Sequence, residues 1–197
     1  MGLNELVRQI VAVLRYIAGP AVGIVVVWLV DDGHDVVQVA AEALWPWSKP
    51  PSPWPLLALL ALIGVTVYFA HRTLVHPFIT IALERFHNRK RKLKVSTDDL
   101  DFARWRRRGS EEHTPAHSTQ AALDVSNAAI HFFYCSGWSS VLIAIVFSRA
   151  FPNDFQIGSP WVFRSIVALL FVTALVGDFR LARLDIEAYH RHNARDA

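Results

Sequence analysis

The sequence predicts an all-α, polytopic membrane protein with four transmembrane helices and a helical cytoplasmic extension. Three observations lead to this fold class: four long apolar runs, a hydrophobic content of 53% with a mean hydropathy of +0.28, and positive charge gathered in one connection. The runs cover about residues 6–30, 55–77, 128–149 and 161–178. A helix of about 20 apolar residues crosses the ~30 Å hydrocarbon core of a bilayer. The 197 residues therefore read as one four-helix transmembrane domain.

The charge pattern predicts how this domain is oriented. A basic helical loop covers about residues 78–127, and its positive cluster is Arg89, Lys90, Arg91, Lys92, Lys94, Arg104, Arg106, Arg107 and Arg108. The connection between the first two runs is acidic instead, with Asp31, Asp32, Asp35 and Glu42. Because positive loops stay in the cytoplasm, we expect this loop and both termini to be cytoplasmic. The pattern fits a multi-pass protein of a bacterial inner membrane.

The first run reads as a retained helix, because it is too long for the apolar region of a signal peptide and no small-residue cleavage site follows it. Gly19 and Gly23 form a G-x-x-x-G pair, which allows another helix to approach closely. Packing within one subunit and packing between subunits are both open. Pro20 lies inside the pair and removes a backbone donor, so we expect a kink there.

The second run begins at Pro55, which suits the first turn of a helix. We expect a short interfacial helix before it at Val36–Leu44. Helical spacing continues past Pro77, so the second helix should project out of the membrane to about Lys94. A second short helix is expected at Thr97–Arg108, followed by a loop at 109–118.

The third helix should begin near Ser118 or Thr119. The short connection at about 150–160 predicts that the third and fourth helices are antiparallel neighbours. The apolar part of the fourth helix ends at Gly177 and Asp178, and a charged helical tail follows.

A polar stripe on the third helix is the best functional lead. Its members are three or four residues apart and share one helical face: Gln120, Asp124, Asn127, His131, Cys135 and Ser139. Polar groups in a membrane need partners or water. One interpretation is a water-filled path lined by repeated copies of this helix. The other is that its first third is solvated outside the bilayer, while Cys135 and Ser139 pack as small residues.

Histidines gather on the predicted cytoplasmic side, where eight of the nine lie. His71 and His76 leave the membrane with the second helix, and His113 and His117 follow in the loop. These pairs resemble the histidine boxes of membrane fatty-acid desaturases and hydroxylases. The resemblance implies a di-iron centre held by His71, His76, His113 and His117. The chain departs from that pattern, since it is short and has no His-His doublet. A haem between His71 and His131 is a further alternative.

The basic cluster indicates what the protein contacts outside the bilayer core. Lysine and arginine beside a membrane attract anionic lipid headgroups, each contributing about 1 kcal/mol near the surface. Docking of a cytoplasmic protein partner is the second interpretation. Nucleic acid is not expected, because only Phe102 and Trp105 are aromatic residues interleaved with the positive charges.

Together these features favour a non-enzymatic inner-membrane component without a cofactor. We expect it to form a homo-oligomer around the third helix and to act as a pore-like channel or sensor subunit coupled to a cytoplasmic partner. Bacterial stress response or antiphage defence would suit such a small four-helix protein, by architectural analogy alone. Two alternatives stay open: a histidine-box, metal-dependent membrane oxidoreductase or hydroxylase, and a structural accessory subunit of a larger membrane complex.

Overall fold

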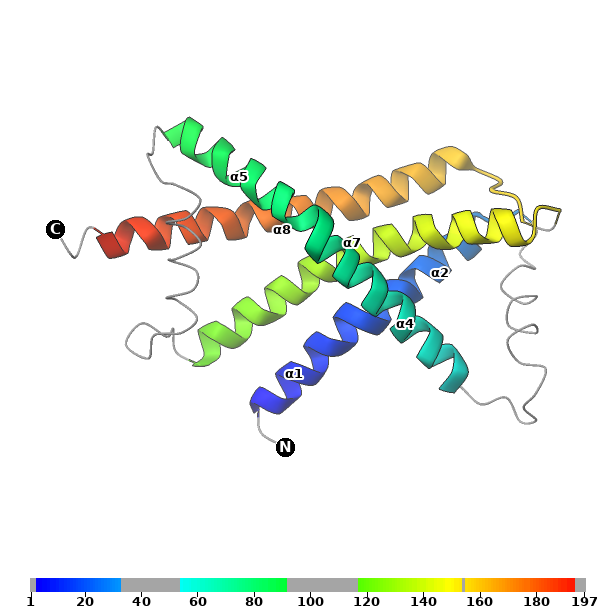
Figure 1. Ribbon diagram of the computed structural model, residues 1–197, viewed down its shortest axis with the longest axis horizontal. Helices are drawn as coiled ribbons and strands as arrows, with labels where there is room; N and C mark the ends of the chain where they lie inside the picture. Colours follow the sequence, from blue (N-terminus) through cyan, green and yellow to red (C-terminus); the bar gives the residue numbers. More distant parts are fainter. Residues whose placement is uncertain (1–2, 33–53, 92–116, 154, 194–197) are drawn as a thin grey trace.

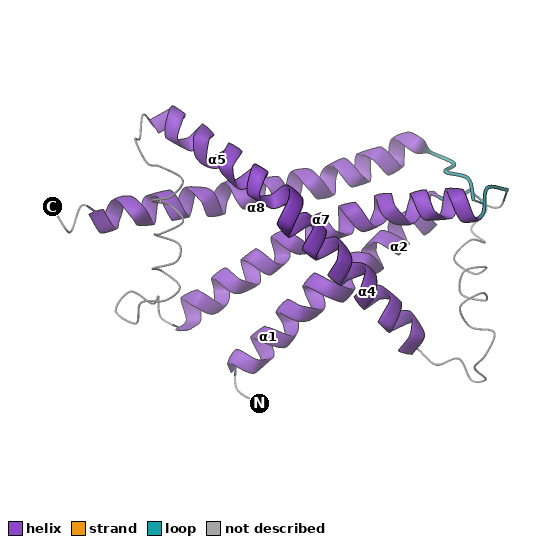
Figure 2. Cartoon of the chain, in the orientation of Figure 1, coloured by secondary structure: helices purple, strands orange, loops and turns teal. Residues whose placement is uncertain are grey.

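The computed structural model of the protein describes residues 3–32, 54–91, 117–153 and 155–193, and this part of the chain is all-helical (Figure 1, Figure 2). Its only pairing of extended backbone is an isolated bridge between Asp31 and Ile157. Four helical segments are long and apolar enough to cross a membrane: Gln9–Val30, Leu57–Leu83, Val125–Ala150 and Pro160–Leu181. The expected all-α chain with four such segments is confirmed.

The first segment is one continuous helical path with a π-turn in its middle. It consists of α1 (Leu3–Val13), the π-turn η1 (Leu14–Ala18) and α2 (Gly19–Val30). Pro20 has no N–H for the carbonyl group four residues earlier, which interrupts the α-helical hydrogen-bond ladder at this place. The interruption expected at Pro20 therefore coincides with a change of helix type.

The second segment repeats this design. It consists of α4 (Trp54–Ala70), the π-turn η2 (His71–Val75) and α5 (His76–Arg91). The π-turn again ends two residues before a proline, which here is Pro77. The prediction that the helix continues past Pro77 is confirmed as far as Arg91.

The third and fourth segments belong to long uninterrupted helices. Helix α7 covers His117–Ala150, so it begins within two residues of the predicted start. Helix α8 covers Pro160–Asn193 and includes the expected charged helical tail. The interfacial helix expected at Val36–Leu44 and the short helix expected at Thr97–Arg108 lie outside the described residues.

Helix α7 is the centre of the bundle, since it contacts α1, η1, α2, α4 and α8, while α5 packs on α8. In Figure 1, α5 ends, α7 begins and α8 ends toward the left, and we name this the projecting end. Helices α2 and α7 end and α8 begins toward the right, and we name this the loop end. The antiparallel arrangement expected for the third and fourth helices is present.

Glycines set the distance between the helices. A Cβ atom on Gly64 of α4 would clash with the Tyr16 carbonyl oxygen, so α4 is pressed against the backbone of η1. Gly19 and Gly23 of α2 make the same kind of contact with α7, where a Cβ atom would lie 2.8 Å from the Cβ atoms of Cys135 and Ser139. Small residues at such positions let helices approach closely where no aqueous hydrophobic effect drives them together.

The loop end is closed by an apolar cluster and by backbone pairing. Its buried residues come from α2, α7 and the connection at 151–159, and aromatic rings surround them: Val27, Ile143, Ala144 and Phe155, with Phe147 and Phe151. Beside this loop-end cluster, the Gly158 N–H donates to the Val30 carbonyl at 2.9 Å. These contacts fasten the end of α2 to the connection between α7 and α8.

Candidate functional site

Ionisable side chains from three segments meet inside the bundle. We name them the interior polar cluster: His71 of η2, His76 at the start of α5, His131 and Tyr134 of α7, and Asp178 of α8. His71, His131, Tyr134 and Asp178 are buried, and His76 is half-buried. All five lie in three of the four segments that are apolar enough to cross a membrane. An ionisable group within such a segment is a functional-site hypothesis by default, because it would be costly to keep in a bilayer.

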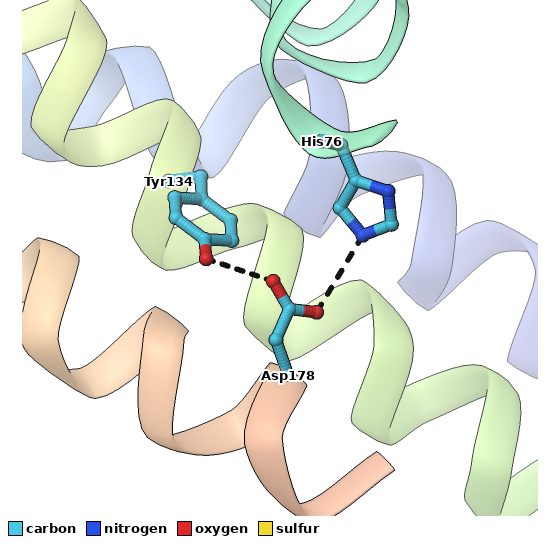
Figure 3. Close-up of polar contacts among 3 residues, drawn as sticks. All are labelled: His76, Tyr134 and Asp178. Atoms are coloured by element: carbon cyan, nitrogen blue, oxygen red, sulfur yellow. Dashed lines mark hydrogen bonds and ion pairs between the residues drawn. The ribbon is translucent and has the colours of Figure 1, made fainter. Parts of the chain in front are cut away.

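Asp178 links two helices through its two carboxylate oxygens (Figure 3). The Tyr134 hydroxyl donates a hydrogen bond of 2.7 Å to Oδ2 of Asp178. The Nε2 atom of His76 lies 3.5 Å from the other oxygen, Oδ1. A carboxylate that is only 7% exposed needs such partners, because a buried charge without them is strongly unfavourable. Asp178 therefore ties both α7 and the base of α5 to α8.

The three imidazole rings form a compact group around this carboxylate. The ring centroids of His76 and His131 are 5.3 Å apart, and those of His71 and His131 are 6.0 Å apart. His71 also stacks on the Tyr134 ring, with a centroid distance of 4.2 Å. Any change in the charge of one ring is therefore felt directly by the others.

The π-turn explains why His71 and His76 share a face. The backbone N–H of His76 donates to the carbonyl oxygen of His71, five residues earlier, which is the bond that defines a π-helix. One wider turn therefore separates the two histidines. In an α-helix, residues five apart would not face the same neighbour. On α7, the spacing of three residues from His131 to Tyr134 places both on one side of an ordinary helix.

Trp138 fixes the tautomer of His71. Its indole Nε1 lies 3.2 Å from Nδ1 of His71, and an indole nitrogen can only donate. Nδ1 is therefore the acceptor, and the neutral ring carries its proton on Nε2. That Nε2 atom is buried and has no hydrogen-bond partner among the described residues. His71 is thus held neutral, since a charged ring would have to give up the bond from Trp138.

A cation lies at the edge of the cluster. The Arg72 Nη1 donates a hydrogen bond of 2.6 Å to the Tyr68 hydroxyl, and the guanidinium also lies over the Tyr68 ring. The buried Tyr68 ring in turn contacts the His131 ring, with centroids 5.2 Å apart. Tyr68 therefore separates the exposed arginine from the histidines.

The polar stripe divides into parts with different surroundings. His131 belongs to the interior polar cluster, whereas Cys135 and Ser139 are buried against Gly19 and Gly23 of the same chain. Asn127 is half-buried, and the side chains of the remaining stripe residues, Gln120 and Asp124, are not described. Cys135 and Ser139 thus match the packing interpretation. The interpretation as a channel lining would need these two side chains to be released from α2.

Most of the predicted basic cluster cannot be placed. Arg89, Lys90 and Arg91 form the end of α5, although their side chains are not described. Lys92, Lys94 and the group Arg104, Arg106, Arg107 and Arg108 lie outside the described residues. The structure thus carries the beginning of the basic segment out of the bundle on a continuous helix.

Of the four histidines of the metal hypothesis, the structure describes the side chains of His71 and His76. His71 and His76 are neighbours, with ring centroids 5.9 Å apart. His113 lies outside the described residues, and His117 begins α7 with a side chain that is not described. Within the part of the chain that the structure describes, no group of three or more His, Cys, Asp or Glu is arranged to hold a metal ion.

Sequence reasoning missed three members of this region. The sequence pattern places Asp178 only at the end of the apolar part of the fourth helix, and it assigns no role to Tyr134 or Trp138. An acidic residue three positions inside an apolar segment is itself the signal that could have found Asp178. Once Asp178 is recognised, Tyr134 can be found as a residue of the neighbouring helix whose hydroxyl can donate to this carboxylate.

Comparisons with protein-family models, with curated proteins and with solved structures found no match to this chain. Its function therefore has to be inferred from the residues and their geometry.

Proposed function

We propose that the protein is a non-enzymatic sensor subunit of a bacterial inner membrane, coupled to a cytoplasmic protein partner. One observation carries this proposal: the His76–Asp178 contact joins the base of the projecting helix α5 to α8 inside the bundle. A change in this contact acts on the helix that leads to the basic segment. The positive-inside pattern supports placing the projecting end, with both termini, in the cytoplasm.

The local structure gives α5 a hinge. The π-turn η2 and Pro77 interrupt the regular hydrogen-bond ladder at the base of α5, and such interruptions are where helices bend. Beyond the hinge, α5 is held to α8 by the His76–Asp178 contact and by the ring contact of Phe86 with Phe179. A hinge with one polar fastening would allow α5 a fastened and a released arrangement, and a switch needs two such arrangements.

The output surface of this sensor is the basic cluster. Arg89, Lys90 and Arg91 are carried by α5 itself, so a movement of α5 changes where they are presented. A positive segment at a membrane surface attracts anionic lipid or an acidic protein surface. In the proposed signal, the basic segment leaves the anionic lipid and binds a cytoplasmic protein partner.

A sensor agrees better with the packing than a pore does. The inner part of the polar stripe is covered by α2 of the same chain, and Gly23 leaves no space between α2 and Ser139. Self-association remains part of the proposal, but through the outer faces of the bundle rather than around the third helix. Helix α8 offers the most uncovered face, since only 17% of the apolar part of its segment Pro160–Leu181 is buried inside the protein.

The test is the distance between spin labels on α5 and α7 in lipid nanodiscs at about pH 5.5, where a histidine is charged. Spin labels are attached at Arg85→Cys of α5 and Ser126→Cys of α7, two exposed positions near the projecting end. The single native cysteine is replaced by Cys135→Ala. Asp178→Asn keeps the shape of the side chain and removes its charge, so we expect the distance distribution to shift and broaden. The matched control is Thr173→Ala on α8, an exposed residue whose hydroxyl bonds only to its own helix at Leu169.

The outcomes separate clearly. A shift in Asp178→Asn with none in Thr173→Ala supports the fastening of α5 as the switch. Identical distributions in Asp178→Asn and the parent protein would show that this contact does not position α5, and the proposed sensor mechanism would then be wrong.

A further inference from the structure

The interior polar cluster is closed toward the loop end and reaches toward the projecting end. His76 and Asp178 lie seven and three residues from the projecting ends of the segments Leu57–Leu83 and Pro160–Leu181. His76 is also the cluster member with the largest opening, since 28% of its side chain is exposed against 8% for Asp178. Between the cluster and the loop end lies the loop-end apolar cluster around Val27 and Phe155.

We propose that the interior polar cluster is a proton-binding site that is loaded from the projecting end, with His76 as the group that accepts the proton. This inference rests on the proposed function, because it names the signal that changes the His76–Asp178 contact. In the binding step a hydronium ion gives its proton to an imidazole nitrogen of His76 and leaves as water. No other bond forms or breaks.

The groups that face His76 select it as the acceptor. From α8, the carboxylate of Asp178 lies 3.5 Å away and stabilises an imidazolium. From α7, Tyr134 donates to the far oxygen of that carboxylate, which leaves Oδ1 turned toward His76. The exposed cations nearby are Arg72 of η2, which is held on Tyr68, and Arg180 of α8.

The other two histidines limit the site to one proton. His71, from η2, is kept neutral because its Nδ1 accepts the hydrogen bond from Trp138. His131, from α7, has its ring centroid 5.3 Å from that of His76, so two charged rings there would repel each other. One positive charge opposite one carboxylate gives a pair without net charge, whereas a second proton would leave a net positive charge inside the bundle.

The direction of the response follows from this pairing. With the proton bound, imidazolium and carboxylate attract each other and hold the base of α5 on α8. When the proton leaves, the attraction between opposite charges on His76 and Asp178 is lost, while the hydrogen bond from Tyr134 to Asp178 stays. Acid on the projecting side therefore holds α5, and a rise in pH on that side releases it.

The experiment repeats the α5–α7 label distance at about pH 5.5 and about pH 8, a range in which a histidine changes charge. At the lower pH the parent protein should give the held distribution, in which α5 is fastened to α8. At the higher pH it should give the shifted distribution, in which α5 is released. His76→Gln cannot carry the charge and should give the shifted distribution at both values. His76→Arg carries it permanently and should give the held distribution at both, so the test does not depend on one variant folding. Thr73→Ala, an exposed change in the same π-turn, should respond as the parent protein does.

A second measurement tests whether the interior polar cluster is closed toward the loop end. Proteoliposomes with a trapped pH-sensitive dye receive an external pH step, and the protein should add no proton leak beyond that of empty vesicles. A leak abolished by His76→Gln would mean a conducting path and would overturn the one-sided site.

The failures of the two proposals differ. If His76→Gln keeps the full pH response, or if His131→Gln removes it instead, His76 is not the acceptor. If Asp178→Asn shifts α5 while the distance in the parent protein does not depend on pH, the sensor mechanism is supported and the proposal that a proton is its signal is wrong. If neither pH nor Asp178→Asn moves α5, both proposals fall.

Discussion

The Tyr134 hydroxyl donates a 2.7 Å hydrogen bond to Oδ2 of Asp178, and both side chains are buried between α7 and α8. The two residues are 44 positions apart in the sequence, so this bond is a tertiary fastening rather than a local one. It also orients the carboxylate, because with Oδ2 engaged the other oxygen is turned to His76 (Figure 3). The geometry of the proposed switch depends on this bond.

Tyr134→Phe tests that dependence with the loss of one oxygen atom. A hydrogen bond to a charged group contributes about 1.5–3 kcal/mol, so we expect the free energy of unfolding to fall by about that amount. Unfolding in detergent micelles measures it. The control is Ser148→Ala, an exposed residue of the same helix whose hydroxyl bonds to Ile145, and it should change stability by less than about 0.5 kcal/mol. Equal effects of the two variants would mean that the Tyr134–Asp178 bond adds nothing to stability.

The tautomer of His71 gives a prediction that spectroscopy reads directly. Nitrogen NMR of the histidine-labelled protein should show His71 protonated on Nε2 and unprotonated on Nδ1, because Trp138 donates to Nδ1. Trp138→Phe keeps an aromatic ring and removes the donor, so the His71 signals should shift toward a mixture of tautomers. His131, which the Trp138 bond does not involve, serves as the internal reference. A His71 signal that is the same in both proteins would show that Trp138 does not set the tautomer.

Helix contact at Gly64 gives a prediction on folding. A Cβ atom there would meet the Tyr16 carbonyl oxygen, which belongs to rigid backbone, so α4 and η1 would have to separate. We expect Gly64→Ala to lower the unfolding free energy by about 3 kcal/mol, the upper range for overpacking. Gly137→Ala is the matched control, because the nearest atoms there belong to the end of the Phe171 ring at 3.0–3.3 Å, so a shift of a few tenths of an ångström makes room. The midpoint of thermal unfolding should fall much further for Gly64→Ala, and similar midpoints would contradict this packing.

Hydropathy and periodicity predicted the segments of this fold but not how they bend. The four apolar segments agree with the predicted ones within six residues at every boundary, because burial in lipid selects for apolar length. Pro20 indicated a break in the hydrogen-bond ladder, whereas at Pro77 the spacing predicted only that the helix continues. The sequence did not say that a π-turn would precede each proline, since the same apolar pattern suits turns of either width. At η1 the wider turn packs against Gly64 of α4, a neighbour on another helix that periodicity along one helix does not reveal.

The interior polar cluster shows the same limit more sharply. His71 and His76 were placed in a metal hypothesis, His131 in a polar stripe, and Asp178 only at the end of the apolar part of a helix. Periodicity assigns residues to faces of one helix, but it does not say which faces meet. The meeting of these residues depends on the π-turn, which turns His76 toward α8, and on the crossing of α7 and α8. Both are properties of the packed bundle.

Native mass spectrometry from detergent micelles separates the three classes of function. For a sensor subunit we expect one defined oligomer whose mass equals a whole number of chains, with no bound iron. Two iron masses per chain, lost in His71→Ala or His76→Ala, would instead support the histidine-box oxidoreductase. A broad mixture of unstable species would suit an accessory subunit that needs a larger complex. The variant Asp178→Asn provides a further control. A sensor that assembles through the outer faces of the bundle should keep its subunit number when this interior contact is removed.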